Sequence, residues 1–185
     1  MRLFVGLALC DEARLLIERL GLRLRSPGDG MRWSTPEQWH ITLAFLGEVS
    51  ATQESVLVRE LRRVREPPVP LTIDGMGVFE RVGILYAAVD PTPGLAALQR
   101  AVAAAVHASG LSLEDRPYHP HVTLARSKGR SPARNLRRFK AAIEQHRPRV
   151  QWTPSEFLLY ESQLSPSGAQ YVVRARFALE QDGAG

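Results

Sequence analysis

The stretch His40-Ile41-Thr42-Leu43-Ala44 decides the fold, because it returns 81 residues later as His121-Val122-Thr123-Leu124-Ala125. Three further pairs of landmarks keep this spacing to within one residue: Asp11 and Pro93 at the start of helix patterns, Ser50 and Ser131 at the start of second helix patterns, and Val69 and Val150 in strand-like runs. Landmarks that share one offset indicate that the chain is a duplication.

Each copy has the pattern of a strand, a helix, a motif strand, a second helix and a further strand. Turn residues also predict hairpins over 79–86 and 160–171, and no glycine-rich strand-to-helix turn favours a doubly wound parallel sheet. The sequence therefore predicts an α+β protein with two pseudo-symmetric lobes of antiparallel sheet and outer helices around a central groove. We expect a single bilobal domain over 1–185, with repeats at about 1–81 and 82–162 and a closing strand at about 170–179.

Apolar spacing predicts which helix faces are buried. The expected stripes are Leu16, Leu20 and Leu24; Leu57, Leu61 and Val64; Leu95, Leu98, Val102 and Val106; and Leu136, Phe139 and Ile143. Thr92 is the expected N-cap of the third helix, and Gly110 is expected to end it.

Strand alternation predicts two faces in the first motif: His40, Thr42 and Ala44 on one, and Ile41, Leu43 and Phe45 in a core. The second motif repeats this pattern, with Ala125 beside His121 and Thr123. By the same alternation Arg126, the counterpart of Phe45, falls on the opposite face from His121.

A single His-x-Thr is usually a pair of satisfied polar groups, but two copies at the repeat offset indicate a shared site. One imidazole can accept a proton while the other donates one, which suits in-line opening of a phosphodiester. The threonine hydroxyls can donate hydrogen bonds to phosphate oxygens. This design requires neither a metal nor a cofactor, and we predict none.

The net charge of +5 is unevenly distributed. Residues 126–149 carry nine Arg or Lys against one Glu, and the rest of the chain is mildly acidic. The segment is either a phosphate-facing patch or a solvated helix face. The single cysteine fits a reducing cytoplasm, and no apolar run is long enough to span a membrane.

The motifs resemble those of the two-histidine (2H) phosphoesterases, in particular the RNA 2',3'-cyclic phosphodiesterases, also called 2'-5' RNA ligases. The resemblance rests on residues 39–47 and 119–126, and extends to 2–7 and 160–171. It implies metal-independent opening of a 2',3'-cyclic phosphate to a 2'-phosphate, with reversible 2'-5' joining of RNA ends. It also implies that His40 is the proton donor, that His121 is the acceptor, and that Thr42 and Thr123 hold the phosphate.

Three further residues are predicted to bind substrate: Arg126, which the family pattern places at the phosphate, its counterpart Phe45, and Tyr118, which could stack on a base. Trp33 could also stack on a base, although core packing fits it equally well. His119 is expected either to support the site from behind His121 or to act as a turn residue, because Pro120 intervenes and no Asp, Glu or Cys ligand set for a metal lies nearby.

The predicted partners are RNA ends or small cyclic phosphate nucleotides, with no membrane and no obligate protein partner. Two alternatives stay open from the sequence. The chain could be a phosphodiesterase for another cyclic phosphate, such as a cyclic nucleotide or ADP-ribose cyclic phosphate. It could also be a non-catalytic RNA-binding module that uses the basic segment.

Overall fold

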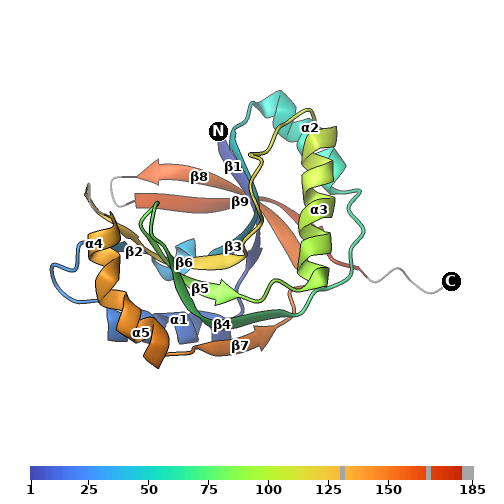
Figure 1. The fold of residues 1–185 in the computed structure, drawn as a ribbon. Coiled ribbons are helices and arrows are strands. Elements are labelled where there is room, and N and C mark those ends of the chain that lie inside the picture. Colours follow the sequence, from blue (N-terminus) through green and yellow to red (C-terminus); the bar gives the residue numbers. More distant parts are fainter. Residues whose placement is uncertain (130–131, 166–167, 181–185) are drawn as a thin grey trace.

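The computed structural model describes residues 1–129, 132–165 and 168–180, and within them the chain forms two antiparallel sheets flanked by helices (Figure 1). The first sheet has the strand order β3 (His40–Glu48), β1 (Arg2–Ala8), β8 (Glu156–Ser165) and β9 (Gly168–Ala178). The second has the order β2 (Met31–Trp33), β6 (His121–Ser127), β5 (Ile84–Val89), β4 (Leu71–Phe79) and β7 (Arg149–Trp152). The predicted α+β class with two antiparallel lobes is confirmed.

The helices are α1 (Asp11–Leu24), α2 (Ala51–Leu61), α3 (Pro93–Ala108), α4 (Pro132–Leu136) and α5 (Lys140–Gln145), with short 3₁₀ turns η1 (Pro36–Gln38) and η2 (Arg137–Phe139). Figure 1 shows α2 and α3 side by side on one flank, while α4 and α5 lie on the opposite side of the molecule. Among the described residues, no helix combines the length and apolar character needed to cross a membrane.

The two repeats exchange strands. β4 follows the first motif in the chain, yet it pairs with β5 and β7 in the sheet of the second motif. β8 follows the second motif, and it pairs with β1 beside the first motif. Both sheets are therefore built from strands of both repeats. The predicted repeat limits near 81 and 162 stay a prediction.

Both predicted hairpins are present. Phe79 pairs with Ile84 between β4 and β5, and Ser165 pairs with Gly168 between β8 and β9, although residues 166–167 of that turn lie outside the described residues. The strand expected at Val69 starts at Leu71 and runs to the hairpin at Phe79, with a register shift against β5 between Ile73 and Met76. β4 and β8 each carry an aromatic residue toward a motif histidine.

Helix α3 forms as its sequence predicts. The Thr92 hydroxyl accepts a hydrogen bond from the amide of Leu95 at 3.2 Å, and Pro93 occupies the first turn. The stripe of Leu95, Leu98, Val102 and Val106 is fully buried. Gly110, with φ of +82°, follows the helix in the left-handed region that favours glycine.

Two helix predictions need correction. The buried stripe of α1 runs through Ala13, Ile17, Leu20 and Leu24, whereas Leu16 is only half-buried. The last predicted helix is not continuous, because η2 separates α4 from α5 and buries Phe139 at the break. Ser131, its expected cap, lies outside the described residues.

Candidate active site

Each motif strand begins at its histidine and runs against the first strand of its own repeat. His40 pairs with Ala8 of β1, and His121 pairs with Ala88 of β5. The apolar residues between the polar ones are buried, with Ile41 and Val122 fully so. The first three residues of each motif thus alternate between the two faces of their sheet, as predicted.

A β-bulge then resets the alternation in both motifs. Leu43 is the extra residue of β3, since Ala44 pairs with Val5 and Thr42 pairs with Gly6. Leu124 is the extra residue of β6 at the corresponding position. A bulge reverses the expected facing of the side chains that follow it, up to the next register shift, which in β3 lies at Leu46.

The bulges overturn the parity prediction for the residues that follow. Ala44 and Ala125 are buried in the main core instead of lining the face of the histidines. Phe45, predicted to anchor the core, is 38% exposed, and Arg126 is exposed as well. Phe45 therefore lies on the same face as His40 and Thr42, and Arg126 lies on the same face as His121 and Thr123. The repeated bulge is what brings Arg126 to the site.

Each bulge has its extra carbonyl satisfied by a different element. The side-chain amide of Gln99 on α3 donates to the Leu43 carbonyl at 3.4 Å. The backbone amide of Ser34 donates to the Leu124 carbonyl at 2.8 Å. An unpaired buried carbonyl would disfavour the bulge, so these contacts stabilise the geometry of both motifs.

Both imidazoles have the same orientation. Nδ1 of His40 lies 2.7 Å from the Gln38 carbonyl oxygen, and Nδ1 of His121 lies 2.8 Å from that of His119. A carbonyl oxygen only accepts hydrogen bonds, so Nδ1 carries the proton in each ring and Nε2 is left for chemistry. In the first half-site the Thr42 hydroxyl lies 3.1 Å from Nε2 of His40 and donates to it.

Aromatic side chains surround both histidines. The His40 ring contacts Phe4 at a centroid distance of 4.5 Å, Tyr171 edge-on at 5.1 Å, and Tyr160 at 6.1 Å. The His121 ring contacts Phe79 edge-on at 5.1 Å and Tyr86 at 5.5 Å. These rings were not among the sequence candidates, although Phe79 and Tyr160 are 81 residues apart like the motifs.

This environment disfavours the charged imidazole. Burial lowers the pKa of His40 to about 4; the positive charges of His121 and Arg126 add to the effect, and the hydrogen bond to Gln38 opposes it. Burial likewise lowers the pKa of His121, helped by the charges of His119, Arg126 and Arg116. Since the charges of His121 and Arg126 act on His40, the two half-sites lie within electrostatic reach of each other.

The remaining candidates occupy different surroundings. Tyr118 packs against the main core with its hydroxyl buried, and no hydrogen bond to that hydroxyl occurs within the described residues. These contacts favour packing over the predicted base stacking. Trp33 donates to Asp29 at 2.8 Å and packs edge-on against Phe139. His119 supplies the carbonyl that orients His121, and its own ring contacts Phe79 edge-on at 5.0 Å.

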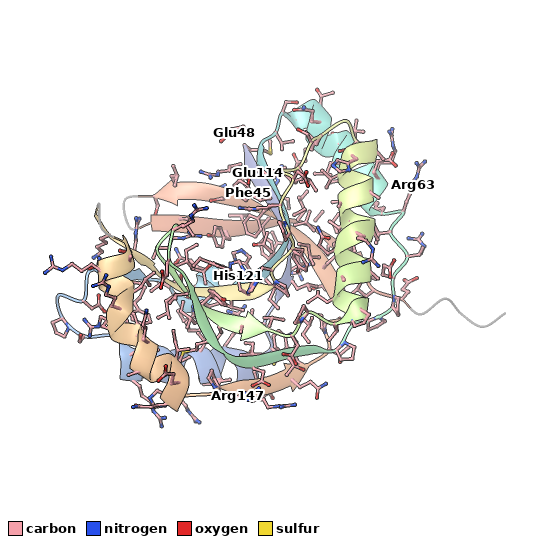
Figure 2. All side chains as sticks on the ribbon, viewed as in Figure 1. Phe45, Glu48, Arg63, Glu114, His121 and Arg147 are labelled. Atoms are coloured by element: carbon pink, nitrogen blue, oxygen red, sulfur yellow. The ribbon has the colours of Figure 1, made fainter. Side chains whose placement is uncertain are left out.

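The basic segment, residues 126–149, does not form one continuous phosphate-facing patch. Arg147 and Arg149 both pair with Asp74, and Figure 2 shows Arg147 at the lower edge of the molecule, away from the central His121. Lys140 pairs with Glu80, while Arg138 donates to the hydroxyl of Ser26. Arg130 lies outside the described residues. Arg126 is the member of the segment whose charge lowers the pKa of both histidines.

Comparison with known proteins agrees with this architecture. Residues 11–165 match the model of the 2'-5' RNA ligase superfamily. The chain is 32% identical over 158 residues to the RNA 2',3'-cyclic phosphodiesterase of Escherichia coli strain K12, covering 84% of each chain. It is 29% identical over 179 residues to that of Thermotoga maritima, covering 94% of this chain and 92% of the other.

Solved structures show the same arrangement. The crystal structure of E. coli LigT complexed with 3'-AMP superposes with a TM-score of 0.81 at 30% identity, covering 97% of this chain and 98% of that one. The MHV ns2 PDE domain superposes with a TM-score of 0.61 at 13% identity, a likeness of fold alone.

Proposed function

Since the chain belongs to the 2'-5' RNA ligase superfamily, we propose that it opens RNA 2',3'-cyclic phosphate ends to 2'-phosphates, with His40 and His121 as acid and base. The observation that carries the proposal is the shared orientation of the two rings. Each has Nδ1 fixed by a backbone carbonyl, so each Nε2 is available to a phosphate lying between them.

The reaction proceeds as an in-line displacement at phosphorus. Nε2 of His121 takes a proton from water as the water oxygen forms its bond to phosphorus. The bond from phosphorus to O3' breaks on the opposite side, and Nε2–H of His40 delivers its proton to O3'. The product keeps the phosphate on O2'. Proton exchange with solvent restores both rings, and a 5'-hydroxyl in place of water would join two RNA ends through a 2'-5' linkage.

The proposed binding groups stabilise the phosphate as charge develops on it. The hydroxyls of Thr42 and Thr123 and the guanidinium of Arg126 donate hydrogen bonds to its non-bridging oxygens. Phe45 lies at the matching position of the first half-site, with the Arg2 guanidinium 5.0 Å above its ring. The two half-sites are therefore chemically unequal, which supports different roles for the two histidines.

Substrate binding also changes the protonation of His40. A ring whose pKa is about 4 is neutral at pH 7 without substrate. The negative phosphate stabilises the imidazolium and raises the pKa of the ring, so the acid becomes charged when substrate is bound. We further propose that RNA ends are the partners and that the protein acts in the cytoplasm, in keeping with its single cysteine.

The test is hydrolysis of an RNA oligonucleotide with a 2',3'-cyclic phosphate end in the presence of EDTA, with the product identified by phosphorus NMR. We expect undiminished turnover to the 2'-phosphate, and a loss of roughly 10²–10⁴-fold in His40→Ala and in His121→Ala. His107→Ala, which removes an exposed histidine of α3, serves as the control. Unchanged turnover in either motif variant, or a 3'-phosphate product, would contradict the proposal.

A further inference from the structure

A cavity of about 270 Å³ lies beside His40 on the active-site face of the first sheet. Its volume is close to the roughly 300 Å³ at the small end of ligand pockets, which suits a single nucleobase. The lining side chains come from α1, η1 and the strands β1, β3, β8 and β9, and include His40, Tyr160, Tyr171, Glu156 and Arg176.

Strand register places these residues on one face. Tyr160 pairs with Phe4, and Glu156 lies four residues before it on the same side of β8. Tyr171 and Arg176 reach that side of β9 because a bulge at Arg174 shifts the alternation between them. The cavity therefore has aromatic rings next to His40 and an ion pair, Glu156 with Arg176, further along the sheet.

In-line chemistry determines which end of the substrate faces this cavity. If His40 protonates O3', then the ribose that carries the cyclic phosphate lies on the His40 side of phosphorus, and water lies on the His121 side. The base of that ribose is then directed toward the rings of Tyr160 and Tyr171. Aromatic side chains are the usual stacking partners of an unpaired terminal base.

The ion pair selects among the bases. A carboxylate only accepts hydrogen bonds, and the Arg176 guanidinium donates one to the carboxylate of Glu156. Guanine alone among the four bases presents two adjacent donors, N1–H and the N2 amino group, to one carboxylate. Adenine and cytosine place a ring nitrogen acceptor beside their amino donor, and uracil offers one N–H between two carbonyls.

We propose that this cavity binds the base of the nucleotide bearing the cyclic phosphate and that Glu156 makes it prefer guanine. The inference rests on the proposed function, because it takes the leaving oxygen to be on the His40 side. Arg176 is the positioning residue for the Glu156 carboxylate.

The test compares kcat/KM for four short RNAs that differ only in the terminal base carrying the 2',3'-cyclic phosphate. We expect the guanosine end to be favoured by roughly tenfold, the discrimination of one bidentate contact. Glu156→Gln should reduce this preference to within about twofold, since an amide offers only one acceptor. Glu161→Gln is the matched control, because Glu161 lies on the opposite face of the same strand and contacts Arg174.

The outcomes separate this inference from the proposed function. Equal rates on all four RNAs, or a guanine preference that survives in Glu156→Gln, would overturn the base site while leaving the phosphodiesterase intact. Hydrolysis of none of the four by the wild-type protein would instead defeat the proposed function. A melting temperature for Glu156→Gln equal to that of the wild type shows that the variant is folded.

Discussion

Replacing His40 should change how the stability of the protein depends on pH. The pKa of this ring falls from 6.5 to about 4 when burial and the neighbouring positive charges act on it in the folded chain. Between these two values the unfolded chain holds a proton that the folded chain does not. Stability is therefore complete above pH 6.5 and is lost as the pH falls toward 4.

The size of this effect follows from the difference in pKa. A difference of about 2.5 pH units corresponds to about 3.4 kcal/mol, of which about 2 kcal/mol is already lost at pH 5. His40→Asn removes the titrating ring and keeps an N–H group near the Gln38 carbonyl. We expect the unfolding free energy of the variant to fall about 2 kcal/mol less than that of the wild type between pH 8 and pH 5.

The assay is urea unfolding followed by fluorescence at several pH values. The wild-type protein, His40→Asn and the control His107→Asn are measured side by side. Carboxylates titrate alike in all three proteins, so the difference between their curves isolates the histidine. His107→Asn, at an exposed position, should follow the wild type. Parallel curves for the wild type and His40→Asn would refute the argument that His40 is held neutral by its surroundings.

Three further predictions concern catalysis. The optimum of kcat/KM should lie below pH 6.5, because both histidines have lowered pKa values in the free protein, and the optimum of kcat should lie higher because bound phosphate raises them. Arg126→Ala should move the pH profile of kcat/KM to higher pH, since the charge of Arg126 lowers the pKa of both His40 and His121. Coincident profiles for the variant and the wild type would count against a place for Arg126 in the site. Thr42→Val should lower kcat by about 10²-fold, as expected for one lost oxyanion donor, whereas Thr42→Ser retains most activity; equal losses in both would point to packing.

The sequence predicts the parts of the site that repeat. The sequence identifies the motif residues because their spacing matches that of the helices and strands around them; they are His40, Thr42, His121 and Thr123. The resemblance to a known family adds the reaction and an order for the two histidines. The buried stripe of α3 follows from apolar spacing alone.

The orientation of Phe45 and Arg126 could not be predicted by strand alternation. A bulge inserts one residue without a distinctive sequence, and Leu43 and Leu124 look like ordinary core residues. Only the partner strands, together with Gln99 and Ser34, show that the alternation is broken there. The family pattern nevertheless indicates a phosphate role for Arg126, against its expected parity.

The aromatic residues that surround the histidines could not be predicted from the sequence either. Tyr160 and Phe79 reach the two rings because β8 and β4 exchange between the sheets. Such long-range pairing leaves no local signal. The charge of the basic segment is evident in the sequence, but its ion pairs are not. Pairs such as Arg147 with Asp74 appear only in the fold, so the sequence alone overstates how much of this charge is free to bind phosphate.

A double-mutant cycle would show whether one histidine from each repeat acts on the same phosphate. Groups that act as a unit give strongly non-additive losses when removed together. We expect kcat for RNA 2',3'-cyclic phosphate opening to be about as low in His40→Ala/His121→Ala as in either single variant. Losses that multiply in the double variant would show instead that the two histidines act independently and do not share one phosphate.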